Sequence, residues 1–158
     1  MGATWTILVA LLWHWIFVPN FNALIGSRKE DEVDKKGDVD THFERMRCIL
    51  RRLPAEFKAR QLPWYDERKH AGYMTLKNPK TGAQITGEST NSAFSRQGRY
   101  NCCWVDEFAV IDPALQNEIW KAMGDSTPCR IVSSTPMGAG NKFHQLRQGC
   151  KKWAKMTA

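Results

Sequence analysis

Two adjacent acids, Asp106 and Glu107, end a short apolar run and are the residues best placed to do chemistry. The run before them, Cys102–Val105, has the composition of a strand buried on both faces. Carboxylates at the end of a buried strand are costly unless something uses them. Such a pair can hold Mg²⁺ through the first acid and polarise an attacking water with the second. On the dipeptide alone, two solvated acids at the surface are the favoured interpretation.

Other polar residues are expected at the same edge of the sheet. The runs 21–26 and 129–133 also have the composition of strands, and an apolar helix begins directly after Thr4. Ligands of parallel sheets bind at the carboxyl ends of the strands, and free N–H groups at a helix start suit a phosphate. The residues expected to form a triphosphate cradle are Gly2, Ala3, Thr4, Ser27, Arg28, Asp106, Glu107, Ser133, Ser134 and Thr135.

The elements that position these residues alternate between strands and helices. The apolar stretch 5–18 predicts a buried helix that ends at Pro19. It lacks a basic leader and a cleavage site and is short for a membrane span, so a signal anchor is the lesser alternative. Further helices are expected after Ser27, over 113–123 and from Asn141. This alternation predicts an α/β fold with a largely parallel sheet.

The helix expected from Thr41 is amphipathic, with Thr41 and Glu44 in capping-box position. Apolar residues recur at helical spacing at Phe43, Met46, Ile49, Leu50 and Leu53. The opposite, solvated side is expected to carry Arg45, Arg47, Arg51 and Arg52. Contact of these arginines with DNA is the lesser alternative.

Between that helix and the central strand, one loop and one hairpin are expected. Segment 55–72 contains Pro63 and several charges and is predicted to be irregular. Segments 73–76 and 84–87 flank a Pro- and Gly-containing turn at 78–82, which predicts a hairpin.

The composition describes an ordinary globular chain. With 158 residues, 42% hydrophobic and 25% charged, it has room for one domain with a genuine core. Its net charge of +7 favours a polyanionic partner, which makes nucleic-acid contact a candidate function. The five cysteines form no CxxC pair and the four histidines show no zinc-site spacing, so we expect reduced thiols and no zinc.

Five short motifs, in their order along the chain, resemble the ATPase domain of the large terminase subunit of tailed bacteriophages. They occupy 25–31, 87–90, 95–99, 104–109 and 133–143. Each motif is weak alone, but the ordered set is fairly specific. The resemblance implies a three-layer P-loop NTPase (RecA/ASCE-like) fold that uses ATP and Mg²⁺.

The resemblance also implies a role for individual residues. Asp106 and Glu107 match the Walker B pair, with Asp106 on Mg²⁺ and Glu107 orienting water. The remaining matches are nucleotide binding by Gly2, Ala3 and Thr4, with Thr4 also on Mg²⁺, an arginine finger at Arg96 or Arg99, and a coupling motif at Ser133, Ser134 and Thr135.

The chain departs from the family pattern at the phosphate loop. The position of the usual lysine holds Ala3, and the front of the loop and the adenine-binding segment would precede Met1. The nuclease domain would follow Ala158. We therefore expect residues 1–158 to be a partial ATPase domain, from phosphate-loop tail through coupling motif, incomplete at its N-terminus and inactive or weakly active alone.

The resemblance implies a motor that moves double-stranded DNA into a procapsid in the bacterial host cytoplasm, without contact with a membrane. Its implied partners are the portal protein, the terminase small subunit and further copies of itself in a ring. Two alternatives remain: a helicase-like DNA-dependent P-loop ATPase, and a non-enzymatic DNA-binding or assembly remnant of a prophage. A test of nucleotide binding distinguishes the remnant, which would bind DNA without nucleotide, from both enzymes.

Overall fold

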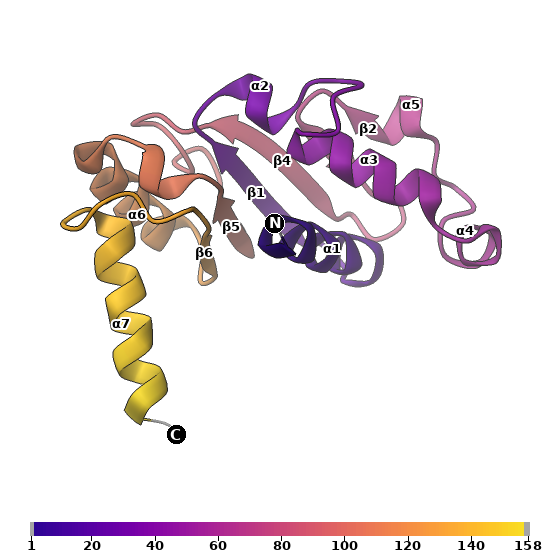
Figure 1. Ribbon diagram of the computed structural model, residues 1–158. Helices are drawn as coiled ribbons and strands as arrows, with labels where there is room; N and C mark the ends of the chain where they lie inside the picture. Colours follow the sequence, from indigo (N-terminus) through magenta and orange to yellow (C-terminus); the bar gives the residue numbers. More distant parts are fainter. Residues whose placement is uncertain (1, 157–158) are drawn as a thin grey trace.

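The computed structural model describes residues 2–156, with the side chains of residues 2–150. Its strands are β1 (Asn22–Ser27), β2 (Ala71–Gly72), β3 (Thr75–Lys77), β4 (Gln84–Ser89), β5 (Cys102–Val105) and β6 (Arg130–Val132). They form one sheet in the order β2-β3-β4-β1-β5-β6 (Figure 1). The pairs β4–β1, β1–β5 and β5–β6 are parallel, whereas β2–β3 and β3–β4 are antiparallel. The predicted α/β class with a largely parallel sheet is confirmed.

Helices cover both faces of this sheet. They are α1 (Gly2–Phe17), α2 (Glu30–Val33), α3 (His42–Arg52), α4 (Ala55–Gln61), α5 (Glu67–His70), the 3₁₀ turn η1 (Phe108–Val110), α6 (Pro113–Ser126) and α7 (Lys142–Met156). Because side chains alternate along a strand, Ile25 and Trp104 join one core with α1 and α3. Leu24 and Val105 join a second core with η1 and α6. The structure therefore has the three layers that were predicted.

Most predicted elements are present at or near their expected positions. The hairpin exists as β3 and β4, and the helix predicted over 113–123 is α6, which extends to Ser126. The Asp112 side chain caps α6 by accepting hydrogen bonds from the backbone N–H groups of Ala114 and Leu115. All five cysteines are free, as expected, and the described part of the chain holds no helix long and apolar enough to cross a membrane.

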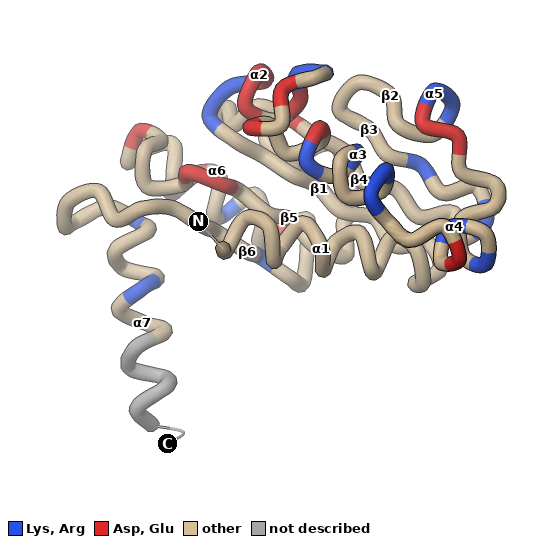
Figure 2. The backbone as a smooth tube through the Cα atoms, turned by 45° about the vertical axis from the view of Figure 1, so that its right-hand side comes forward, with Lys and Arg blue, Asp and Glu red and all other residues tan. Residues whose placement is uncertain are grey.

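Helix α1 is buried on one side only, which corrects the prediction of a buried helix. Its inward side carries Leu8, Leu11, Leu12 and Trp15, each at most 3% exposed. Its outward side carries Trp5, Val9, Trp13 and Phe17, each at least 40% exposed. These four residues are spaced by four, so they form one apolar stripe along the helix. Figure 2 shows α1 without a charged residue.

Segment 55–72, predicted to be irregular, contains α4, α5 and β2. Two of these elements are very short, and neither α4 nor α5 has a fully buried residue, so their sequence periodicity is weak. Phe57 packs against the core and holds α4 in place. The Asp66 side chain caps α5 by accepting from the Arg68 N–H.

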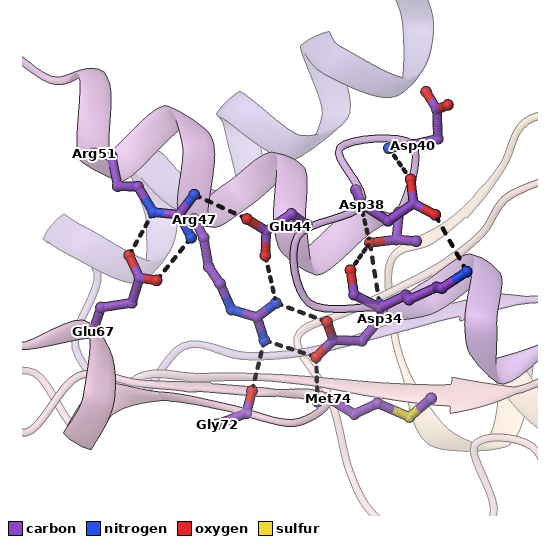
Figure 3. Close-up of polar contacts among 11 residues, drawn as sticks. Asp34, Asp38, Asp40, Glu44, Arg47, Arg51, Glu67, Gly72 and Met74 are labelled. Carbon is purple, nitrogen blue, oxygen red and sulfur yellow. Dashed lines mark hydrogen bonds and ion pairs between the residues drawn. The ribbon is translucent and has the colours of Figure 1, made fainter.

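The arginines of α3 are not a solvated row, which corrects a second prediction. Arg47 is only 4% exposed and makes a bidentate contact with Asp34, at 2.7 and 2.8 Å (Figure 3). Glu44 does not close a capping box: it is buried and contacts Arg47 at 3.1 Å and Arg51 at 2.9 Å. Thr41 is the N-cap residue, but its side chain makes no capping hydrogen bond.

This ion-pair network ties α3 to the segments around it. Asp34 follows α2 and also accepts a hydrogen bond from the Met74 N–H, while Arg47 donates to the Gly72 carbonyl. Arg51 contacts Glu67 of α5 at 2.8 Å. These charged side chains therefore pair with each other, which leaves little basic surface on α3 for contact with DNA.

Candidate active site

Asp106 and Glu107 lie where β5 ends and the chain turns into η1. All four residues of β5 are buried, and the Asp106 N–H donates to the Gly26 carbonyl, which holds Asp106 against β1. Asp106 is 7% exposed, whereas Glu107 is exposed. Glu107 adopts a left-handed backbone with φ of 52°, a conformation that non-glycine residues rarely adopt without a constraint. The turn places one buried and one exposed carboxyl group next to each other.

The two oxygens of the Asp106 carboxylate have different surroundings. Oδ1 accepts a hydrogen bond of 2.6 Å from the Ser133 hydroxyl and one of 3.1 Å from the Glu107 N–H. The Trp104 indole N–H donates in turn to the Ser133 oxygen at 2.8 Å. Among the described residues, the one hydrogen bond that Oδ2 accepts is a long one of 3.3 Å from the Thr4 hydroxyl. Oδ1 is therefore fixed by the protein, and Oδ2 is available to a ligand.

The polar residues after β6 reach both acids. Ser133 binds Asp106 as described, and its backbone N–H continues the pairing with β5 by donating to the Val105 carbonyl. The Ser134 hydroxyl approaches the Glu107 carboxylate at 3.4 Å. Thr135 faces the same space. A shift of this segment would therefore move groups that touch each carboxylate.

A cavity of about 900 Å³ brings the predicted residues together at the carboxyl edge of the sheet. It is lined by Ala3 and Thr4 from α1, Asp106 and Glu107 after β5, and 133–135 after β6. This volume lies within the usual range for a site that binds a nucleotide-sized ligand. The predicted convergence of the three segments is thus present in the structure.

The predicted residues at the start of α1 are only partly in this cavity. Ala3 and Thr4 line it, but Gly2 does not, and Met1 lies outside the described residues. Ser27 lines the cavity and donates to Glu32 at 2.9 Å. Arg28 is turned into an ion pair with Glu32 at 2.8 Å and does not line the cavity.

Arg96 and Arg99 lie elsewhere. They line a second cavity of about 530 Å³ together with residues of α6, and Arg99 donates to the Asp125 carbonyl. Neither arginine lines the cavity that contains Asp106. Within one copy of the chain, the structure does not bring them to the acidic pair.

His42, the first residue of α3, belongs to the cavity and was not predicted. It is 4% exposed, its Nε2 lies 3.6 Å from Asp106 Oδ2, and its ring lies 4.8 Å from that of Trp104. In the described part of the chain, neither ring nitrogen has a hydrogen-bond partner. Burial lowers the pKa of His42 from 6.5 to about 4, against an opposing effect of the Asp106 charge, so the ring is neutral at pH 7. No local motif links positions 42 and 106, which only tertiary packing brings together.

The oxygen donors in the cavity fit a hard divalent cation such as Mg²⁺. Asp106 Oδ2 and the Thr4 hydroxyl are close together, and carboxylate and hydroxyl oxygens are ligands that Mg²⁺ accepts. Among the described residues, no group of three or more His, Cys, Asp or Glu side chains is placed to hold a metal ion. Mg²⁺ bound here would take further ligands from water and phosphate, as it does at nucleotide sites.

Comparison with known proteins supports the fold. Neither a protein-family model nor a curated protein sequence matches the chain. The structure is similar to the ATPase domain of the large terminase of Thermus phage P74-26, with a TM-score of 0.59 and 17% identity, over 88% of this chain and 57% of that one. At such identity the likeness shows the fold, and it confirms the predicted P-loop NTPase-like class.

Two further phage proteins share this fold. The large terminase of a thermophilic bacteriophage matches with a TM-score of 0.56 and 11% identity, over 88% of this chain and 32% of that one. The large terminase of bacteriophage HK97 matches with a TM-score of 0.54 and 15% identity, over 85% of this chain and 27% of that one. The terminase of the thermophilic phage has also been solved in complex with ADP. This chain thus spans slightly more than half of the first relative and about a third or less of the other two.

Proposed function

We propose that this chain is part of the ATPase domain of a phage terminase large subunit, which hydrolyses ATP to move double-stranded DNA into a procapsid. One observation carries the proposal. A buried and an exposed carboxyl group, Asp106 and Glu107, share a cavity of about 900 Å³ with hydroxyl groups from two other elements. The terminase-like fold adds the expectation of nucleotide chemistry at that edge of the sheet.

In this proposal the two carboxyl groups have different roles. Asp106 holds Mg²⁺ through Oδ2, with Thr4 on the same cation, while Ser133 and the Glu107 N–H fix Oδ1. Bound Mg²⁺ would neutralise charge on the phosphate oxygens. Glu107 orients the attacking water and accepts its proton. Its carboxylate is accessible for this role because the residue is exposed and the Ser134 hydroxyl contacts it only at the long distance of 3.4 Å.

The start of α1 is proposed to bind phosphate. The helix has 16 residues, so its first N–H groups and its dipole favour an anion near Gly2, Ala3 and Thr4. The usual phosphate-loop lysine has no counterpart at these positions. The affinity of this segment for phosphate therefore depends on its backbone N–H groups and on the bound cation.

The segment 133–135 is proposed to couple the nucleotide state to DNA movement. It contacts Asp106 through Ser133 and Glu107 through Ser134. Loss of the γ-phosphate would change the charge that both carboxylates face, and these hydroxyl groups would transmit the change to the backbone after β6.

Arg96 or Arg99 is proposed as an arginine finger that stabilises charge on the transferred phosphoryl group. Both line a cavity apart from Asp106, so the finger would be supplied to a neighbouring copy in a ring.

The other proposed partners are the portal protein and the terminase small subunit, and the proposed location is the cytoplasm of the bacterial host. The net charge of +7 suits the DNA substrate.

The test is phosphate release from Mg²⁺-ATP by the full chain, with and without double-stranded DNA. We expect Glu107→Gln to lower the rate by about 10²- to 10⁴-fold, as for loss of a general base, while nucleotide binding persists. Glu56→Gln, at an exposed position of α4 away from both cavities, is the matched control and should leave the rate unchanged. Salt-sensitive DNA binding without any nucleotide binding would contradict the proposal and support a DNA-binding protein that lacks catalysis.

A further inference from the structure

The free oxygen of Asp106 faces a nitrogen as well as a hydroxyl group. Thr4 Oγ1 lies 3.3 Å from Oδ2, and His42 Nε2 lies 3.6 Å from it. We propose that Nε2 of His42 is a direct ligand of the cation that Asp106 holds, and that it makes the site prefer Mn²⁺ to Mg²⁺. This inference rests on the proposed function, since it concerns the cation of the same site.

The two distances from Asp106 Oδ2 to the other donors fit a shared cation. Ligand atoms at about 2.0–2.2 Å from one metal ion, at angles of about 90–110°, lie about 2.8–3.6 Å from each other. Both distances from Asp106 Oδ2 fall in this range. A hydrogen bond from the imidazole to the carboxylate would be shorter, so 3.6 Å is too long for that simpler interpretation.

The burial of His42 makes the missing partner costly. The residue is almost fully buried, and neither of its ring nitrogens has a hydrogen-bond partner among the residues that the structure describes. Most buried polar groups in folded proteins are hydrogen-bonded, and those that are not need an explanation. The Trp104 ring, 4.8 Å away, and the first turn of α3 hold the imidazole at the cavity wall. A cation at Oδ2 would satisfy the nitrogen that faces it.

The change of metal preference follows from the donor set. Mg²⁺ takes oxygen ligands and keeps several waters, whereas an imidazole nitrogen is an ordinary ligand of first-row transition metals. Carboxylate oxygen also suits Mn²⁺. A site with one carboxylate, one hydroxyl group and one imidazole should therefore gain more affinity for Mn²⁺ than for Mg²⁺.

Pulsed electron paramagnetic resonance of Mn²⁺ tests the inference without activity. The full chain with Mn²⁺ and ADP should show ³¹P couplings from the nucleotide and ¹⁴N couplings from a bound imidazole. Labelling the protein with ¹⁵N-histidine should convert the imidazole couplings to ¹⁵N without changing the fold. His42→Gln should lose them and bind Mn²⁺ about 10-fold more weakly, with Mg²⁺ affinity almost unchanged, whereas His70→Gln, away from the cavity, should keep them.

The outcomes separate the two proposals. Phosphorus couplings without histidine nitrogen couplings in the unmodified chain would overturn the inference and leave the proposed function standing. Absence of both would overturn both. Nitrogen couplings that persist in His42→Gln would assign the ligand to another histidine and also overturn the inference.

Discussion

At the scale of single residues, the carboxylate of Asp106 depends on the hydroxyl group that fixes it. Ser133 donates to Oδ1 at 2.6 Å and is itself held by the Trp104 indole. Partners of this kind orient a metal ligand, and their loss costs about 10- to 100-fold in metal affinity. We predict that Ser133→Ala weakens Mn²⁺ or Mg²⁺ binding by about this factor, measured by titration. Ser134→Ala, which removes only a 3.4 Å contact to Glu107, should leave cation affinity unchanged.

His42 gives the fold a defined pH dependence. Its pKa is about 4 in the folded chain and 6.5 ordinarily, so the unfolded chain binds more protons between these values. The free energy of unfolding should therefore fall as pH falls from about 6.5 to about 4, by up to ~3 kcal/mol, and this contribution should be constant above and below that window. Urea unfolding of the chain and of His42→Leu measures it. Parallel pH profiles for the two proteins would contradict the prediction.

The residues that line the first cavity differ in how far the sequence reveals their positions. Asp106 and Glu107 were predictable because the buried strand before them is contiguous in sequence. Ser133 was predictable because a short run of strand-forming residues, β6, directly precedes it. His42 was not, because α3 reaches Asp106 only through the packing of its first turn on Trp104. Arg47 was misplaced because its burial depends on Asp34, thirteen positions away, rather than on helical periodicity.

At the scale of elements, the middle of the sheet depends on the absence of one side chain. A Cβ at Gly26 of β1 would lie 2.7 Å from Cζ of Phe94, which is 1% exposed and cannot move aside. We predict that Gly26→Ala lowers the free energy of unfolding by about 1–3 kcal/mol through overpacking. In the matched control, Gly149→Ala in α7, the new Cβ would meet no described atom within 4 Å beyond its chain neighbours and the backbone of its own helix, and the change should be neutral or slightly stabilising. Equal effects in denaturant unfolding would contradict the prediction.

The ion pair between Arg47 and Asp34 anchors α3, and with it His42, to the segment after α2 (Figure 3). Removing one partner leaves a buried charge without its counterpart, which costs about 3–5 kcal/mol. We therefore predict a loss of this size for Arg47→Met in denaturant unfolding. Arg52→Met, at an exposed position of the same helix, should change stability by less than about 0.5 kcal/mol. A small effect of Arg47→Met would show that the pair does not anchor the helix.

Elements with a clear apolar pattern were predictable, whereas α4, α5 and β2 were not. The apolar residues are frequent and regular enough in sequence to identify the helices α1, α3 and α6 and the strands β1 and β5. Helices α4 and α5 have seven and four residues and no fully buried side chain, so their sequences carry almost no periodic signal. The one-sided burial of α1 was also hidden, because its outward stripe is as apolar as its inward one.

At the scale of the whole molecule, charge bears on the proposed binding of DNA. The net charge is +7, but acidic and basic residues are interspersed over α2 to α5, and several pair with each other (Figure 2). We predict that the chain binds double-stranded DNA through phosphate contacts, so that the logarithm of affinity falls linearly with the logarithm of salt concentration. Fluorescence anisotropy of a labelled duplex measures the slope. An affinity that does not change with salt would contradict this mode of binding.

The central claim is that Asp106 holds the cation through which the chain binds a nucleotide. Calorimetric titration of the chain with ADP in the presence of Mg²⁺ tests this most directly. We predict saturable heat for the unmodified chain, at least about 10-fold weaker binding for Asp106→Asn, and unchanged binding for Asp125→Asn, which lines only the second cavity. No heat from the unmodified chain, or equal affinity in Asp106→Asn, would contradict the account.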